Sequence, residues 1–361
     1  MKSQTENKTL LFSPLKLREL EFKNRVFVSP MCQYSAIEGT AQPWHLVHLG
    51  TRASGGAGLV MAEATGVSPE ARISPQDLGL WTREHAQALK PVTDFIHSQN
   101  SVSAVQLAHA GRKAGTAAPW NGAKPVPLNQ GGWIPVGPSP IPYNEGYQTP
   151  KEMDATDINK VLVDFENSTR LAQEAGFQVV EVHMAHGYLL HEFLSPLSNQ
   201  RKDQYGGSLE NRMRFPLQVA ERVRKTWPQH LPVFARISAS DWAEGGWDIE
   251  QSIVLSRALK NLGIDLIDCS SGGNVPWQKI PVVPEYQVPF AEKIKAQVDI
   301  TVGAVGLITE AQQAENILQS QKADVIFLAR ELLRNPYWPL KAAHDLGEPL
   351  VWPRQYDRGK F

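Results

Sequence analysis

Residues 179–188 read Val-Val-Glu-Val-His-Met-Ala-His-Gly-Tyr. The β-branched run predicts a short, buried strand, because strands of parallel sheets are nearly continuous in apolar residues. His183, His186 and Tyr188 follow at the carboxyl end of this strand. In parallel α/β folds, functional side chains gather at that end. The stretch therefore predicts a parallel sheet with polar groups collected at one rim.

The same pattern continues along the chain, where short β-rich runs alternate with amphipathic segments as in βα units. We predict eight strands, at residues 25–28, 59–62, 103–107, 179–183, 232–237, 266–270, 300–302 and 325–328. We predict helices at residues 84–98, 156–175, 209–227, 251–262, 290–297 and 309–319. Eight units indicate an α/β fold, a closed (β/α)8 or TIM barrel, with residues 1–361 forming one domain.

Local signals mark some helix ends and one unusual connection. Thr309 is a candidate N-cap, while Gly176 and Gly263 follow their helices as candidate C-cap glycines. Residues 114–150, after the third strand, are rich in proline, glycine and asparagine and have no helical period. So long a connection suggests a loop that caps the active face, and a surface excursion without ligand contact is an equally good interpretation.

Composition limits the classes of partner. The net charge is −1, with 42% hydrophobic and 20% charged residues, which argues against a nucleic-acid or anionic-membrane binder and favours small molecules. The two cysteines, Cys32 and Cys269, are too few for a disulfide framework or an iron–sulfur cluster, so redox chemistry would need an organic cofactor. Residues 1–10 lack a signal-type apolar segment and no membrane span is evident, so we expect a soluble, cytoplasmic protein.

The rim chemistry suits reduction. Neutral His183 and His186 would each keep an N–H donor for a polarised carbonyl oxygen, and Tyr188 could deliver a proton without prior charge. Other rim residues follow the remaining strands: residues 29–34, 63–65 and 270–273, Gln106, His109, Arg236, residues 303–306, Ala329 and Arg330. A pair of histidines at this spacing is also compatible with a metal site or with two hydrogen-bonded core residues.

Five ordered blocks carry a resemblance to a known family: residues 29–34 (SPMCQY), 106–113 (QLAHAGRK), 183–189 (HMAHGYL), 201–212 (RKDQYGGSLENR) and 303–306 (GAVG). Through them nearly the whole chain resembles the Old Yellow Enzyme family of flavin ene-reductases. Cys32 and His186 resemble the bacterial branch of xenobiotic reductases and thermophilic-like enzymes, where the yeast and plant branch has threonine and often asparagine.

The resemblance implies bound FMN, with NADPH, or NADH, as a transient reductant. It implies hydride transfer through the flavin to the activated C=C bond of α,β-unsaturated carbonyls, and also action on nitro compounds and other xenobiotics. Gly306 and Arg330 would hold the phosphate, and Arg236 would lie beside the flavin edge that becomes negative on reduction. The implied FMN-binding residues are Ser29, Pro30, Met31, Cys32, Ala64, Gln106, Arg236, Gly303, Gly306, Ala329 and Arg330.

By the same resemblance, His183 and His186 would bind the substrate carbonyl, Tyr188 would be the proton donor and Tyr34 would orient the substrate. Residues 350–361 resemble a tail that reaches a neighbouring subunit of a dimer or tetramer through Arg358, although Lys360 here precedes the terminal aromatic residue.

Two alternative functions are also compatible with the sequence. One is a metal-dependent barrel hydrolase that uses His183, His186 and His45 or His48, and the other is a flavin-binding protein without turnover; the leading reading predicts no metal.

Overall fold

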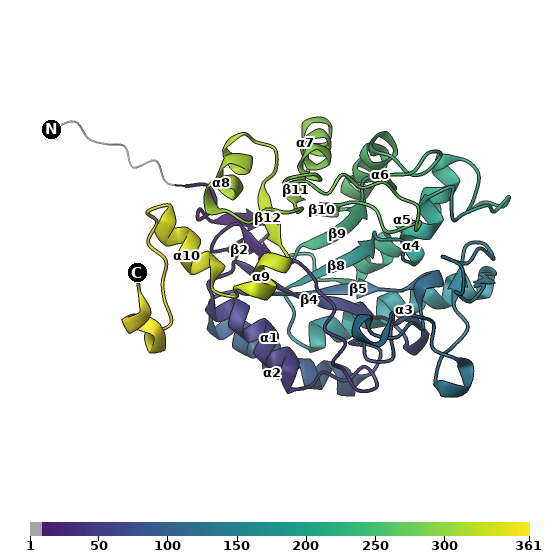
Figure 1. Ribbon diagram of the computed structural model, residues 1–361, viewed down its shortest axis with the longest axis horizontal. Helices are drawn as coiled ribbons and strands as arrows, with labels where there is room; N and C mark the ends of the chain where they lie inside the picture. The colour runs from purple at the N-terminus through teal and green to yellow at the C-terminus, as the bar shows by residue number, and fades with distance from the viewer. Residues whose placement is uncertain (1–8) are drawn as a thin grey trace.

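The computed structural model describes residues 9–361 and contains eight parallel strands that close into a barrel (Figure 1). Around the barrel the strands follow chain order, and β12 pairs with β3 to close it. Their bounds are β3 Val26–Val28, β4 Leu59–Gly66, β5 Val102–Ala108, β8 Val179–Met184, β9 Val233–Ser238, β10 Leu266–Ser270, β11 Thr301–Ala304 and β12 Val325–Leu328. The predicted (β/α)8 barrel is confirmed, with each strand within a few residues of its predicted position.

Helices surround the barrel (Figure 1). They are α1 Pro43–Ser54, α2 Arg83–Ser98, α3 Ala155–Glu174, α4 Leu189–Leu194, α5 Leu209–Thr226, α6 Ile249–Asn261, α7 Val288–Gln297, α8 Ala311–Gln319, α9 Arg330–Arg334 and α10 Trp338–Asp345. The six predicted helices correspond to α2, α3, α5, α6, α7 and α8. The prediction of Thr309 as an N-cap was wrong: Glu310 caps α8, and its side chain accepts from the backbone of Gln313. Gly176 and Gly263 both have φ near +88°, as expected for glycines that end helices.

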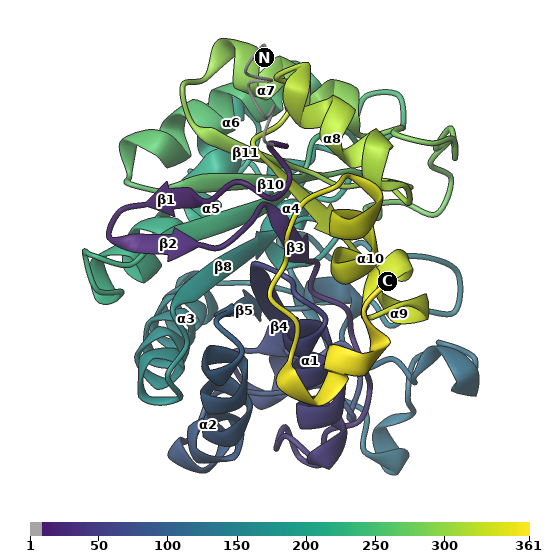
Figure 2. The same ribbon diagram turned by 90° about the vertical axis from the view of Figure 1, so that its left-hand side faces the viewer.

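The bottom of the barrel is closed by a hairpin that the sequence patterns did not predict. Strands β1 (Leu15–Leu17) and β2 (Leu20–Phe22) pair antiparallel beside the barrel (Figure 2). Phe22 at the end of β2 packs against Phe27, with ring centroids 4.9 Å apart, and Phe27 packs against Phe234 and Phe327. All four rings are fully buried, so this end of the barrel is a solid apolar plug. Ligands must therefore enter at the opposite end.

Strands β4 and β11 run two or more residues past their predicted carboxyl ends, which changes the position of residues near those ends. Strand β4 runs to Gly66 and contains an irregularity between Ala62 and Ala64, so Glu63 is an extra residue on this strand. Glu63 accepts from the backbone N–H of Gln33, while Ala64 lies opposite Gln106 in the barrel. Gly303 lies within β11, not in the loop after it.

Residues 114–150 form a long excursion with little regular structure: the 3-10 turns η3 (Pro119–Asn121) and η4 (Leu128–Gln130) and the short strand β6 (Val136–Gly137), which pairs with β7 (Lys151–Glu152). Within residues 9–361, no helix has the length and apolar character needed to span a bilayer. The predicted absence of a signal segment concerns mostly residues outside the described range. The predicted cytoplasmic location stays a prediction.

Candidate active site

The end of β8 places three predicted site residues in mutual contact. The His183 ring centroid lies 5.3 Å from that of His186 and 5.1 Å from that of Tyr188, with both pairs edge to face. Strand β8 fixes His183, and a tight turn brings back the other two. In this turn His186 and Gly187 have φ of +61° and +70°, and Tyr188 forms the N-cap of α4. The predicted cluster is therefore present at one rim.

The protonation states of this cluster follow from burial. Desolvation, followed by the charge of Arg236, lowers the pKa of both His183 and His186 well below the usual value. Desolvation raises the pKa of Tyr188 well above its usual value. At neutral pH the cluster thus offers two uncharged imidazoles and a protonated phenol. Nε2 of His186 lies 2.7 Å from the Ser270 hydroxyl.

Below the rim, four polar side chains cross the interior of the barrel. Nε2 of Gln106 donates to Oε1 of Glu181 at 2.8 Å, and Nε of Arg236 lies 3.1 Å from Oδ2 of Asp268. Burial raises the pKa of Glu181 well above its usual value and that of Asp268 to about 6, although Arg236 opposes both shifts. One guanidinium therefore faces two buried carboxyl groups.

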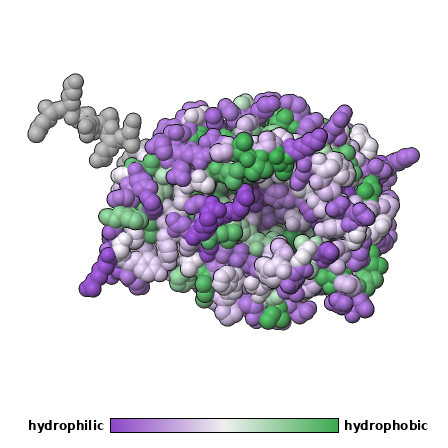
Figure 3. All heavy atoms as spheres, in the orientation of Figure 1, coloured by the Kyte–Doolittle hydropathy of each residue, from purple (hydrophilic) through white to green (hydrophobic). Residues whose placement is uncertain are grey.

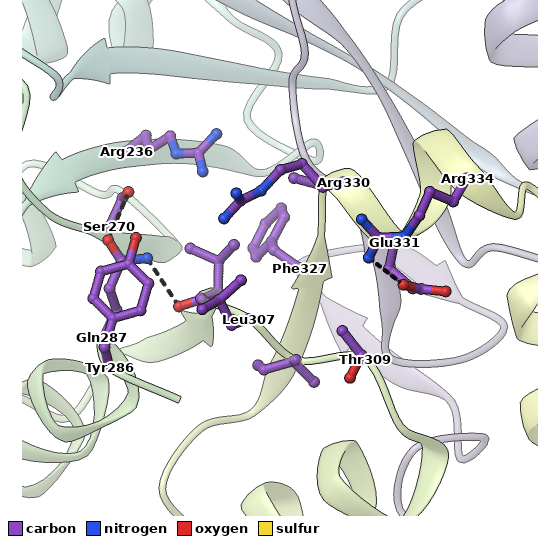
Figure 4. Close-up of a pocket in the computed structure, with 14 residues that line it drawn as sticks. Arg236, Ser270, Tyr286, Gln287, Leu307, Thr309, Phe327, Arg330, Glu331 and Arg334 are labelled. Atoms are coloured by element: carbon purple, nitrogen blue, oxygen red, sulfur yellow. Dashed lines mark hydrogen bonds and ion pairs between the residues drawn. The ribbon is translucent and has the colours of Figure 1, made fainter. Parts of the chain in front are cut away.

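A cavity of about 220 Å³ opens between β9–β12 and α9 (Figure 4). Arg236 and Arg330 come from different elements and turn their guanidinium groups toward each other across this space (Figure 4). Gly306, Ala329 and Arg330, all predicted to bind the cofactor, line it together with Tyr286 and Gln287. Figure 3 shows that this side of the molecule is hollowed near its centre, with hydrophilic residues in the hollow.

Gly306 and Gly303 lack a side chain for different structural reasons. Gly306 has φ of +133°, and a Cβ there would lie 3.1 Å from Nε2 of Gln287, which donates to the carbonyl of Val305. The loop at Gly306 thus needs glycine to run close to the cavity. A Cβ on Gly303 would instead lie 2.4 Å from Cε2 of Phe327 in the barrel core. The absence of a side chain at Gly303 therefore makes room for this aromatic ring.

The loop after β3 contains Ser29, Pro30, Met31, Cys32 and Tyr34, which are buried or half-buried. The backbone N–H of Ser29 donates to the carbonyl of Leu328, so a ligand contact by Ser29 must use another of its polar atoms. Desolvation, then the charges of Asp77 and Glu63, raises the pKa of the Cys32 thiol, which is uncharged at neutral pH. Desolvation also raises the pKa of Tyr34.

The excursion at residues 114–150 contacts the loops of the active face at two points, at the predicted site residue Tyr34 and at Lys113. The Trp120 ring lies edge-on to Tyr34 with centroids 5.5 Å apart, and the Tyr143 ring lies under Nζ of Lys113 at 4.6 Å. Trp133 anchors the segment, because its indole N–H donates to the carbonyl of Glu70 and its ring faces the buried Arg72 guanidinium. These contacts favour the cap interpretation over a surface excursion.

Two predicted groupings are not brought together. Within residues 9–361 no three or more His, Cys, Asp or Glu side chains are grouped so that they could hold a metal ion, and His45 is instead bonded to Gln42 and lies 3.2 Å from Glu63. The hydrolase alternative therefore lacks its ligand cluster. Arg358 is exposed in the turn η5 (Arg354–Gly359) and does not line its own cavity. Figure 2 shows this tail beside α10 and α1.

Sequence reasoning missed residues that support the turn from below. Nδ1 of His191 accepts from the backbone N–H of Gly187 at 2.9 Å, and its Nε2 lies 2.9 Å from Oδ1 of Asp241. Lys113, which belongs to one of the five blocks but had no assigned role, donates to the carbonyls of His186 and Gly273. His191 and Asp241 follow strand ends, which was a usable signal. Gln287 precedes α7 on a long connection, and no pattern in the sequence pointed to it.

The residues present fit FMN. Two arginines and a glycine loop border the cavity, which suits a phosphate and the electron-rich edge of a flavin. Ser29 Oγ and His183 Nδ1 are buried and have no hydrogen-bond partner among residues 9–361, as expected where a polar ligand completes the bonding. Ala64 and Gln106 lie opposite each other on the neighbouring strands β4 and β5.

The chain is similar to known flavin oxidoreductases over most of its length. A profile of the NADH:flavin oxidoreductase / NADH oxidase family matches residues 10–348. The chain is 47% identical over 353 residues to an NADPH dehydrogenase of Geobacillus sp. (strain WCH70), covering 97% of this chain and 98% of that protein. It is 48% identical over 353 residues to an NADPH dehydrogenase of Geobacillus thermodenitrificans (strain NG80-2), with the same coverage of 97% and 98%.

Solved structures show the same likeness. Morphinone reductase superposes with a TM-score of 0.79 at 28% identity, covering 96% of this chain and 91% of that chain. The Old Yellow Enzyme homologue from Zymomonas mobilis superposes with a TM-score of 0.77 at 27% identity, covering 95% and 94%. The match over most of the chain shows that this protein is an enzyme of the NADH:flavin oxidoreductase / NADH oxidase family and belongs to its Old Yellow Enzyme type, whose bound cofactor is FMN.

Proposed function

We propose that this enzyme reduces the activated C=C bond of α,β-unsaturated carbonyl compounds with electrons from NADPH, or NADH, and that nitro compounds and other xenobiotics are further acceptors. The observation that carries the proposal is the contact cluster of His183, His186 and Tyr188 at the rim. Relatives named NADPH dehydrogenase support the choice of NADPH as reductant. Cys32 and His186 favour the bacterial xenobiotic-reductase branch.

Bound FMN supplies the chemistry of hydride acceptance from the nicotinamide and hydride donation to the substrate. The chain's own residues act on the substrate. His183 and His186, uncharged because of burial, donate N–H groups to the carbonyl oxygen and draw electron density from the β-carbon. Tyr188, protonated at neutral pH, gives its proton to the α-carbon. One hydride and one proton together saturate the double bond.

The remaining predicted site residues would bind FMN, favour its reduction or orient the substrate. Arg330 and the Gly306 loop would hold the FMN phosphate, and Arg236 would face the flavin edge that becomes negative on reduction. Gln106 would bind the uracil-like edge through its amide oxygen and its second N–H, since the first N–H donates to Glu181. Tyr34, with Trp120 of the excursion against it, would orient the substrate and cap the pocket.

We also propose that the tail completes the site of a second subunit in a homo-oligomer. Arg358 is exposed, and the tail is held to its own chain through Tyr356, whose hydroxyl lies 3.3 Å from that of Tyr337. It therefore presents Arg358 away from its own cavity. Sedimentation of the full chain should show at least a dimer, and Arg358→Ala should weaken substrate binding without changing the FMN content. A monomer would contradict this part.

The test of the main proposal uses the purified protein. We expect a yellow protein whose flavin absorbance bleaches on anaerobic addition of NADPH and returns on addition of cyclohexenone. Metal analysis should find no stoichiometric zinc. Bleaching without return by any enone or nitro compound would leave a flavin-binding protein that does not carry out the proposed reduction.

A further inference from the structure

Lys113 lies between two loops of the active face. It ends the 3-10 turn η2 (Gly111–Lys113), directly after β5. Its Nζ donates to the carbonyl of His186 at 2.7 Å, in the turn after β8, and to the carbonyl of Gly273 at 2.9 Å, in the loop after β10. One ammonium thus joins two segments that are far apart in the sequence.

The two loops pack backbone against backbone at this point. A Cβ on Gly187 would lie 2.2 Å from the carbonyl oxygen of Gly273, and a Cβ on Gly273 would lie 2.6 Å from Cα of His186. Two carbonyl oxygens that converge on the same space repel each other unless a donor lies between them. The Lys113 ammonium supplies that donor, so it balances the charge of an otherwise repulsive contact.

The turn that Lys113 holds is conformationally demanding. His186 has φ of +61°, in the left-handed region that side chains rarely adopt. Both backbone polar groups of His186 are hydrogen-bonded. Its N–H donates to the Ser238 hydroxyl at 2.9 Å, and its carbonyl accepts from Lys113. Nζ of Lys113 also lies 4.9 Å from the ring centroid of Tyr188, which is a cation–π distance. The same ammonium therefore touches the backbone of His186 and the ring of Tyr188.

We propose that Lys113 is a positioning residue for the reductase reaction: its ammonium clamps the His186–Tyr188 turn to the loop at Gly273 and thereby fixes where the Tyr188 hydroxyl stands over the substrate. This inference rests on the proposed function, because Tyr188 is the proton donor there. Lys113 acts through the turn and does not itself transfer the proton.

The charge of the clamp is sensitive to pH. Desolvation, followed by the charge of Arg112, lowers the pKa of Lys113 to about 7, while Glu192 opposes the shift. The clamp is therefore charged below about pH 7 and becomes a neutral amine above it. The charged and titratable groups that face it are Arg112, Glu192, Tyr143, Tyr188, His183 and His186. Of these, Glu192 titrates nearest, because burial raises its pKa to about 8, whereas the tyrosines are shifted upward and the histidines downward.

The experiment compares FMN-loaded wild type with Lys113→Met, Lys113→Arg and the control Lys293→Met, which removes an exposed lysine of α7. Reoxidation of the reduced enzyme is followed with cyclohexenone and with oxygen. We expect Lys113→Met to slow enone reoxidation about 10- to 100-fold, because a misplacement of about 1 Å costs about that much. FMN content and reoxidation by oxygen, which needs no proton from a positioned tyrosine, should match the control.

The pH profile separates positioning from mere structural support. In wild type, enone reoxidation should fall as the pH rises through about 7, because the ammonium is lost. Lys113→Arg should keep the rate and move this fall to higher pH, since an arginine stays charged. Lys113→Met should lack the fall. Equal rates and profiles in all four proteins would overturn the proposal.

Backbone amide exchange gives a readout that does not depend on turnover. Protection of residues 186–188 in the FMN-loaded protein should fall above about pH 7 in wild type and stay high in Lys113→Arg. If wild type does not reduce enones at all, the proposed function fails, and the exchange result alone decides whether Lys113 clamps the turn. If Lys113→Met does not fold, Lys113→Arg decides through the displaced pH profile. Protection that is independent of both pH and residue 113 would refute the clamp.

Discussion

Nε of Arg236 lies 3.1 Å from Oδ2 of Asp268, and both side chains are buried at the centre of the barrel. The pair stands next to a second buried carboxyl group, that of Glu181, which is bonded to Gln106. A single guanidinium therefore offsets two carboxyl groups beneath the barrel mouth. Its other face is turned toward the cavity that we assign to FMN (Figure 4).

Arg236→Met should destabilise the protein, because it leaves Asp268 buried without a cation. Removing one partner of a buried pair costs about 3–5 kcal/mol of unfolding free energy, measurable by urea denaturation. The double variant Arg236→Met/Asp268→Asn should recover much of this loss, since neither charge is then stranded. The FMN midpoint potential should fall in Arg236→Met, because a cation beside the flavin edge favours reduction. Additive losses in the double variant would contradict the pairing.

His183→Ala and His186→Ala should each slow reoxidation by cyclohexenone while leaving FMN bound. Loss of one preorganised N–H donor costs about 2.7–4 kcal/mol, or about 100- to 1000-fold in rate. Stopped-flow reoxidation measures the rate, and absorbance of the purified protein measures FMN content. His230→Ala, at an exposed position near the β1–β2 hairpin, is the matched control. Unchanged enone rates in both variants would remove the histidines from the proposed role.

Tyr188→Phe should slow enone reduction by about 100- to 10,000-fold, the usual contribution of a positioned proton donor. Oxygen should reoxidise the variant as fast as wild type, because that reaction needs no proton on a substrate carbon. The comparison of the two oxidants in one stopped-flow series is the measurement. Full activity toward cyclohexenone would mean that water or another group supplies the proton.

Gly303→Ala should destabilise the fold and leave FMN binding intact. The new Cβ would meet Cε2 of Phe327 at 2.4 Å, and overpacking of a core costs about 1–3 kcal/mol. Adding Phe327→Leu should restore part of the stability, because it removes the ring that the methyl group meets. Urea denaturation and FMN titration test the two halves. A loss of FMN affinity that Phe327→Leu does not relieve would instead support the implied role of Gly303 in FMN binding.

We expect His109 to make the free energy of unfolding decrease at acidic pH. Burial lowers its pKa from 6.5 to about 4, so the unfolded chain takes up a proton at this histidine before the folded protein does. Its contribution to stability is present above about pH 6.5 and is lost as the pH falls toward about 4, by about 3 kcal/mol. The difference between wild type and His109→Asn in urea denaturation isolates this effect from that of carboxyl groups such as Glu192. The raised pKa of Glu192 makes the free energy of unfolding change with pH in the opposite direction. A difference that does not change with pH would contradict it.

Local sequence was enough to predict the eight strands and six of the helices. Buried strands are nearly continuous in apolar residues, and glycines such as Gly176 and Gly263 mark helix ends through their own backbone preference. The cluster of His183, His186 and Tyr188 was predictable as well, because the three residues lie within six positions on one strand end and one turn. Such features depend on neighbours in the chain.

The tertiary structure decided which side chains meet across strands. Glu63 faces Gln33 and His45 because of an irregularity in β4, Gly303 makes room for Phe327, and Lys113 bridges the carbonyls of His186 and Gly273. Each of these relations joins residues that are tens or hundreds of positions apart. Hydrophobic period and turn residues carry no information about them, because barrel closure and side-chain direction set these distances. The sequence thus determined the strands, the barrel and the reactive turn, whereas packing across the barrel determined what holds that turn in place.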